Sequence, residues 1–222
     1  MTSFKKEDAL KLLQKYNADG RVMDHLWAVH DYAMEIAGQI ECDQDLVEVG
    51  SLLHDIGRTR SHNKDHAIIG ADILRKEGVD EAIVNIVERH IGAGLTEPEA
   101  IKLGLPPKNY VPQTIEEKIV CHADNLIGGT ERVSIQDTIR IARLKWFPAS
   151  VDRLIRMHFE VFTPVTVALS KNCPDVDIAK LDHALEKFDL LYQMKSDDPG
   201  CIILLYGRDS SKAKEFLANF VA

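Results

Sequence analysis

The stretch Leu52-Leu53-His54-Asp55-Ile56-Gly57 places an imidazole next to a carboxylate at the end of an apolar run. Burying such groups is costly unless they are hydrogen-bonded or bound to a metal. Imidazole nitrogens suit iron, zinc or nickel, and carboxylate oxygens suit manganese or magnesium as well. We therefore expect His54 and Asp55 to form the centre of a buried metal site. Neighbours on a regular helix project about 100° apart, so both can reach one site only where the helix ends, and Gly57 supplies that ending.

Hydrophobic periodicity upstream and downstream of this stretch is helical. It predicts helices over about residues 4–16, 24–39, 44–54, 80–90 and from residue 65 onward. The segment 44–54 is apolar on nearly every face and is the expected central helix. Three further histidines, His25, His66 and His90, fall on the inner faces or at the ends of these helices. The pattern thus brings several metal-ligand candidates into one helical bundle.

The C-terminal part of the chain contains no cluster of metal-ligand candidates. Residues 134–143, 149–172, 177–193 and 210–220 have helical patterns. Residues 201–206 fit either a short strand or a buried helical turn, because periodicity does not separate the two. We expect an all-α protein, with a metal-binding domain over residues 1–130 and a helical extension over residues 131–222 packed on it.

Composition limits the class of protein. The chain has 222 residues, 45% of them hydrophobic, and a net charge of −8. This charge argues against a general nucleic-acid binder, which normally has a basic surface, but it allows a small anionic substrate held by a local basic patch. No apolar stretch approaches the roughly 20 residues that span a membrane, and the start of the chain does not resemble a signal peptide. Four widely spaced cysteines favour reduced thiols, so we expect a cytoplasmic protein without a membrane partner.

Two pairs of residues compete for positions in the site. His62 and His66 are one helical turn apart, and we favour His66 because the small residues Gly70 and Ala71 follow it and allow close backbone approach. His62 lies in a connecting segment, where it can face a substrate.

His122 and Asp124 are two residues apart and face opposite sides of a helix. The apolar stripe through Ile119 and Leu126 contains His122, whereas Asp124 projects near Val120. That helix is apolar on two faces, so periodicity leaves both residues open.

Taken together, five short motifs resemble the successive motifs of the HD superfamily of metal-dependent phosphohydrolases, over about residues 20–128. They are Asp24-His25, Leu53-His54-Asp55-Ile56-Gly57-Arg58, His66-Ala67-Ile68-Ile69-Gly70-Ala71, Arg89-His90-Ile91-Gly92 and Ala123-Asp124-Asn125. The pattern is most similar to an archaeal group of small HD proteins, and it is also similar to the YqeK-like hydrolases of diadenosine tetraphosphate.

The resemblance implies an HD-domain helical bundle and selects Asp124 over His122. It implies two divalent metal ions with Asp55 as the shared carboxylate. His25, His54, Asp55 and Asp124 would hold one metal, and His66, His90 and Asp55 the other. The imidazole count favours iron or manganese, and magnesium, cobalt, nickel or zinc remain open.

The expected activity is hydrolysis of a phosphoester or phosphoanhydride in a nucleotide-like molecule, by a metal-activated water. Asp55 and Arg58 are the expected catalytic residues, Arg58 as the phosphate contact. Arg60 and Lys64 are equally well explained as surface charges. Two alternatives stay open: an HD-type di-iron oxygenase, and a non-catalytic nucleotide-binding sensor. The sequence leaves room for a homodimer.

Overall fold

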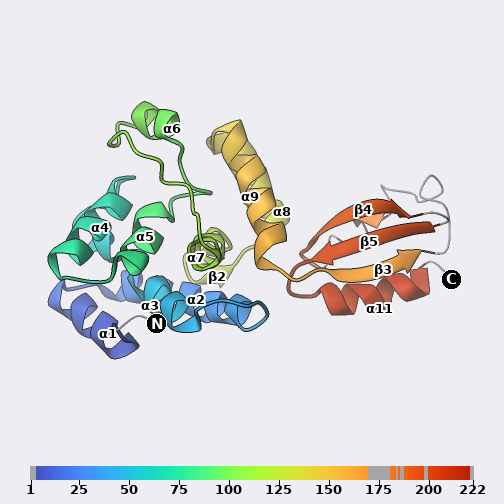
Figure 1. Ribbon diagram of the computed structural model, residues 1–222, viewed down its shortest axis with the longest axis horizontal. Coiled ribbons are helices and arrows are strands. Elements are labelled where there is room, and N and C mark those ends of the chain that lie inside the picture. The colour runs from blue at the N-terminus through green and yellow to red at the C-terminus, as the bar shows by residue number, and fades with distance from the viewer. Residues whose placement is uncertain (1–3, 170–180, 184, 186–187, 198–199, 221–222) are drawn as a thin grey trace.

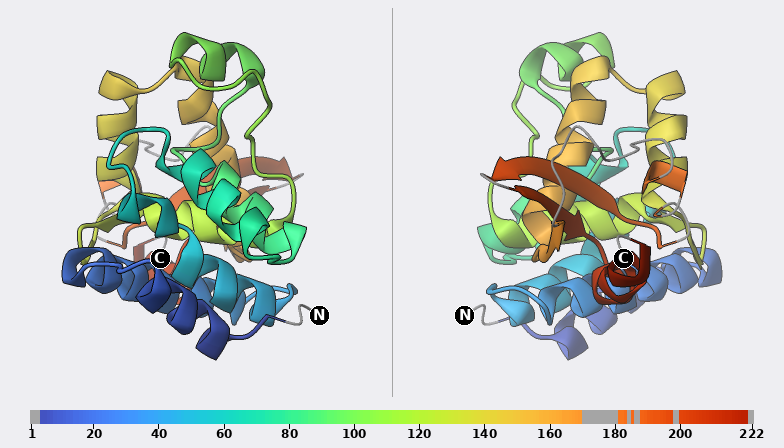
Figure 2. Two further views of the ribbon diagram at one scale, coloured as in Figure 1. Left: turned by 90° about the vertical axis from the view of Figure 1, so that its left-hand side faces the viewer. Right: turned by 90° about the vertical axis from the view of Figure 1, so that its right-hand side faces the viewer.

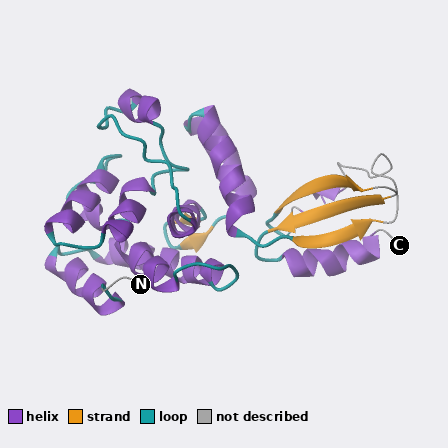
Figure 3. Cartoon of the chain, viewed as in Figure 1, coloured by secondary structure: helices purple, strands orange, loops and turns teal. Residues whose placement is uncertain are grey.

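A computed structural model describes residues 4–169, 181–183, 185, 188–197 and 200–220. Helices fill the chain as far as residue 161, and the strands of the larger sheet gather at the opposite end of the molecule (Figures 1 and 3). The helices are α1 (Lys6–Lys15), α2 (Gly20–Ala37), α3 (Gln44–Leu53), the 3-10 helix η1 (Ile56–Thr59), α4 (His66–Lys76), α5 (Glu81–Arg89), α6 (Glu97–Lys102), α7 (Ile115–Asn125), α8 (Ile135–Lys145) and α9 (Pro148–Val161).

The predicted N-terminal helices are confirmed, and side-chain caps fix where several of them begin. The Asp19 carboxylate accepts a hydrogen bond from the Val22 amide, 2.9 Å away, at the start of α2. A capping box of Thr96 and Glu99 stands before α6, and the Thr114 hydroxyl accepts from the Glu117 amide before α7. Each cap satisfies backbone donors that have no partner inside the helix.

α3 is the central helix, as its apolar pattern predicts. It packs against α1, α2, α5 and α7. Val47, Val49, Leu52 and Leu53 are each at most 1% exposed. Val49, Leu52 and Leu53 contact the apolar faces of α1, α4 and α5, while Val47 belongs to a second cluster with α2, α7, α8 and α9. The C-terminal end of α3 is therefore enclosed by packed helices, which places His54 and Asp55 in the interior.

A three-stranded antiparallel sheet lies beyond α9. Its strands are β3 (Val165–Leu169), β4 (Leu191–Asp197) and β5 (Gly200–Tyr206), in the order β3-β5-β4. Helix α11 (Ser210–Phe220) packs on β3 and β5 and covers one face of the sheet (Figures 1 and 2). A separate apolar core, with Leu205 and Leu217 fully buried, holds this unit together. A short hairpin of β1 (Ile127–Gly128) and β2 (Glu131–Arg132) follows α7.

The expected helix over residues 149–172 is wrong beyond Val161. Pro164 cannot continue a helix, and the β-branched residues Val165, Thr166 and Val167 favour the strand that begins there. Residues 191–193 likewise belong to β4 and not to a helix. Residues 170–180 lie outside the described part of the chain. Residues 201–206, for which the sequence allowed a strand or a helical turn, form a strand.

The predicted helical bundle is confirmed, with a small sheet added to it. α8 and α9 share the core cluster of α2 and α7, and the division of the chain after residue 130 stays a prediction. In the described ranges, every helix is too short or too polar to cross a bilayer.

Candidate metal centre

The six predicted ligands come from five separate segments of the bundle. His25 lies in α2, His66 is the first residue of α4, and Asp124 is in the last turn of α7. His54 and His90 are the first residues after α3 and α5, and Asp55 follows His54 as the residue before η1. α3 does end at this pair, immediately before His54, as two adjacent ligands require.

Gly57 has a different role from the one that the sequence suggests. α3 ends at Leu53, and Gly57 lies inside η1, where the chain crosses α4. A Cβ atom on Gly57 would lie 1.8 Å from the His66 carbonyl oxygen and 2.7 Å from the Gly70 nitrogen. The glycine is therefore needed for close contact between η1 and α4, and this contact brings His66 to Asp55.

The donor atoms form two triads that share Asp55. One triad is His25, His54 and Asp55, and the other is Asp55, His66 and His90, with the donor atoms of each within 4.8 Å of one another. Asp55 Oδ2 lies 3.7 Å from His25 Nε2 and 3.8 Å from His54 Nε2. Asp55 Oδ1 lies 3.1 Å from His66 Nε2 and 3.5 Å from His90 Nε2. Each carboxylate oxygen thus faces one pair of imidazoles.

Asp124 lies beside the first triad. Its Oδ1 is 3.1 Å from His25 Nε2 and 3.5 Å from His54 Nε2. His122 points elsewhere: its Nε2 lies 3.0 Å from His158 Nδ1, and His158 Nε2 lies 3.0 Å from the Tyr206 carbonyl. The structure therefore brings Asp124, and not His122, to the other five predicted ligands.

All four site imidazoles are oriented in the same way. The Nδ1 atoms of His25, His54, His66 and His90 lie 2.6–2.7 Å from backbone carbonyl oxygens. The four carbonyls belong to Gly129, Ser51, Asn63 and Val87. A carbonyl can only accept, so each Nδ1 carries a proton, and a ring in its neutral form turns the lone pair of Nε2 toward the centre. Metal-binding histidines are held by this type of hydrogen bond.

Converging lone pairs require a cation among them. The Nε2 atoms of His66 and His90 are 3.1 Å apart, and both are acceptors when the rings are neutral. His54 Nε2 and Asp55 Oδ1 are buried without a hydrogen-bond partner in the part of the chain that the structure describes. Either protons or metal ions must offset this cost. The mixed imidazole and carboxylate donors fit divalent transition metals, so the residues present suit the expected group.

The pKa values show how strongly these groups interact. Burial disfavours the charge on His54, but the carboxylates of Asp55 and Asp124 outweigh it and raise the pKa of His54 to about 8. Burial also opposes ionisation of Asp55, and the surrounding imidazoles nevertheless hold its pKa well below the usual range. Burial lowers the pKa of His90. A metal ion that takes these donors must displace the proton from His54.

A cleft of about 470 Å³ opens onto the first triad. Its lining residues are Asp19, Arg21, Val22, His25, Asp55, Arg58, His62 and Gly129. The Arg58 Nε–H donates to Asp55 Oδ2, and the guanidinium is one-third exposed toward the cleft. His62 also faces this cleft and is not in either triad. Arg60 lies instead over the ring of Tyr16, at 5.5 Å.

The sequence argument missed several residues that build the site. Gly129, whose carbonyl accepts from His25, was not among the predicted site residues. Asp19 and Arg21, which line the cleft, were not predicted as site residues either. The signal that could have found them is their position immediately before His25, at the start of α2.

Comparison with known proteins places the chain in a family. The model of the HD domain matches residues 22–128. The uncharacterised protein MJ0778 of Methanocaldococcus jannaschii is 50% identical over 162 residues, which are 70% of this chain and 95% of that protein. A tRNA (cytidine(56)-2'-O)-methyltransferase of Thermoplasma volcanium is 48% identical over 152 residues, and the chain spans 45% of its length.

Among solved structures, the chain is similar to the HD domain of the L. monocytogenes phosphodiesterase PgpH in complex with cyclic-di-AMP. The TM-score is 0.47 at 19% identity, over 68% of this chain and 93% of that domain. The near-complete match to the M. jannaschii protein and the HD-domain match over residues 22–128 agree with the geometry of the site. This chain belongs to the HD-domain family.

Proposed function

We propose that the protein is a two-metal phosphohydrolase, which cleaves a phosphoester or phosphoanhydride bond of a nucleotide-like molecule. One observation carries this proposal: two triads of buried donors share Asp55, and every imidazole presents Nε2 to the centre. His25, His54, Asp55 and Asp124 would hold one metal, and Asp55, His66 and His90 the other. When bound, such a metal pair supplies a nucleophilic water at neutral pH and positive charge for the phosphoryl oxygens.

The protein residues supply orientation and charge around that pair. The backbone carbonyls that accept from the four Nδ1 atoms hold the imidazoles in one tautomer. Arg58 lies at the boundary between Asp55 and the cleft, where its guanidinium can donate to a substrate phosphate. Arg58 also neutralises part of the carboxylate charge, which would otherwise repel an anionic substrate.

Methyl transfer is the activity named for the Thermoplasma relative, and this chain spans less than half of that protein. A phosphohydrolase site makes direct use of the donors observed here, whereas methyl transfer from an organic donor needs no such cluster of histidines. An HD-type oxygenase and a nucleotide-binding sensor would use the same donors. An oxygenase would consume oxygen and a sensor would show no turnover, so measuring the products distinguishes both from a phosphohydrolase.

The test is turnover by protein loaded with iron or manganese. We expect release of phosphate, or of a phosphorylated product, from nucleotides, without uptake of oxygen. Asp55→Ala should abolish both metal retention and turnover, because it removes the shared ligand of both triads. Asp31→Ala is the matched control, since this exposed carboxylate pairs with His30 outside the site. Oxygen uptake with an organic substrate, or full activity in Asp55→Ala, would refute the proposal.

A further inference from the structure

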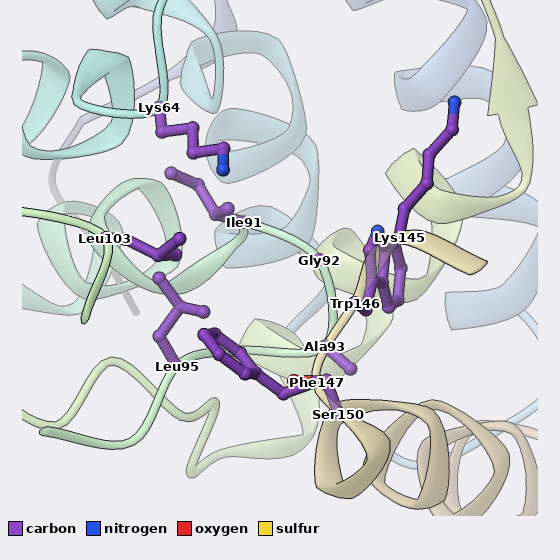
Figure 4. A pocket seen from close by; sticks show the side chains of 11 residues that line it. Lys64, Ile91, Gly92, Ala93, Leu95, Leu103, Lys145, Trp146, Phe147 and Ser150 are labelled. Carbon is purple, nitrogen blue, oxygen red and sulfur yellow. The ribbon is translucent and has the colours of Figure 1, made fainter. Parts of the chain in front are cut away.

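A second cavity, of about 570 Å³, begins at the residue after His90. Its volume lies within the range of small-molecule sites, about 300–1,000 Å³. Figure 4 shows the side chains of Ile91, Leu95, Leu103 and Phe147 around this cavity, with Trp146 beside the loop that carries Gly92. The walls are therefore aliphatic and aromatic, unlike the polar cleft lined by His25, Asp55 and Arg58.

The loop that forms one wall is fixed from two directions. Asn125, next to Asp124, donates through Nδ2 to the Gly92 carbonyl, 2.6 Å away. From α9, Arg153 donates to the carbonyls of Ala93 (3.2 Å) and Gly94 (2.9 Å). The cavity is thus preformed, and the same loop joins it to His90.

Two aromatic side chains form the opposite wall. The indole of Trp146 lies over the backbone of Gly92, where a Cβ atom would be 3.8 Å from the ring. Trp146 and Phe147 are both half-buried, and they lie between α8 and α9, beyond the residues that match the HD domain. Flat faces next to a rigid backbone loop favour a planar ligand group.

Positive charge borders this apolar cavity in a chain of net charge −8. Lys64 lines the cavity, two residues before His66, and its ammonium group points toward Ile91 (Figure 4). Lys145 also lines it, next to Trp146, but its ammonium group extends away from the cavity (Figure 4). Throughout the described ranges, no carboxylate lies within ion-pair distance of either ammonium group. A planar ring with an attached phosphate complements both features.

We propose that this cavity is the subsite for the base of a nucleotide substrate, with Trp146 and Phe147 stacking on the base and Lys64 contacting its phosphate. This proposal rests on the phosphohydrolase function proposed above, because the bound nucleotide is a substrate only if the protein hydrolyses it. Base binding by itself requires neither metal nor turnover.

The test is a fluorescence titration of metal-free protein with AMP. Trp27→Phe leaves Trp146 as the single tryptophan, since the chain has two; Trp27 lies elsewhere, against Lys6 and His30. We expect saturable quenching by AMP, and none by ribose 5-phosphate or inorganic phosphate.

Phe147→Ala should raise the Kd for AMP roughly 5- to 150-fold, as expected for loss of one stacking partner. Leu144→Ala, 82% exposed on α8, is the matched control and should leave the Kd unchanged.

Absence of saturable quenching by AMP, equal quenching by ribose 5-phosphate, or an unchanged Kd in Phe147→Ala would each overturn the subsite. None of these results depends on hydrolysis. If AMP binds as expected and no nucleotide is hydrolysed, the phosphohydrolase proposal fails and the subsite stands. If nucleotides are hydrolysed with equal KM by wild-type and Phe147→Ala protein, the subsite fails alone.

Discussion

His122 and Asp124 show how two neighbouring residues on one helix are assigned to different environments. The apolar stripe of α7 does contain His122, and that side chain is fully buried. Its partner is His158 of α9, which in turn contacts the carbonyl of Tyr206 in β5. Periodicity could not anticipate this pairing, because the partner lies 36 residues away. Asp124 occupies the other apolar face, where the site imidazoles surround it.

The buried His122–His158 pair makes stability depend on pH. Burial lowers the pKa of His158 from 6.5 to about 4, and it lowers the pKa of His122 as well. The folded state therefore disfavours the protonated rings. The part of the unfolding free energy that depends on the neutral form of His158 is fully present above pH 6.5. It is lost as the pH falls from 6.5 to 4, and the total loss from His158 is about 3 kcal/mol.

Urea denaturation at several pH values between 4 and 7 checks this prediction. His158→Gln should reduce the fall in unfolding free energy over this range, because the substituted side chain cannot be protonated. The acidic groups elsewhere titrate equally in both proteins and cancel in the comparison. Identical pH profiles for wild type and His158→Gln would contradict it.

At the scale of elements, the site depends on how closely η1 crosses α4. Gly57→Ala should lower the unfolding free energy by at least about 3 kcal/mol, because the added carbon would overlap the His66 carbonyl. The same displacement moves His66 and should weaken metal binding. Gly20→Ala is the control, since no atom lies within 4 Å of its Cβ position, and its effect should stay within about 0.5 kcal/mol. Equal stability of the two variants in thermal or chemical denaturation would refute this role of Gly57.

The elements that the sequence predicted well are those whose signals are local. Periodicity located α1–α5 to within a few residues, apart from an earlier start for α2. Strand β3 was missed because its pairing is not local: Val165 of β3 pairs with Leu205 of β5, 40 residues further along the chain. The signal at Thr163-Pro164, followed by β-branched residues, was present and could have ended the predicted helix at Val161.

At the scale of the whole molecule, five segments converge on one buried carboxylate. Sequence spacing suggested which histidines face inward, and the HD resemblance added Asp124. The sequence could not show that each oxygen of Asp55 faces a different pair of imidazoles. It also could not show the four carbonyls that orient the rings, because backbone groups have no sequence signature. It also could not show that Trp146 and Phe147, far from the motifs, lie next to the loop after His90.

The central claim is that this centre holds two metal ions which share Asp55. Elemental analysis of protein reconstituted with manganese or iron tests it most directly. The account predicts two metals per chain in the wild type and in His62→Ala, since His62 lies outside both triads. It predicts one metal per chain and a much lower rate in His90→Ala, which removes a ligand of one triad only. One metal in the wild type, or two in His90→Ala, would contradict it.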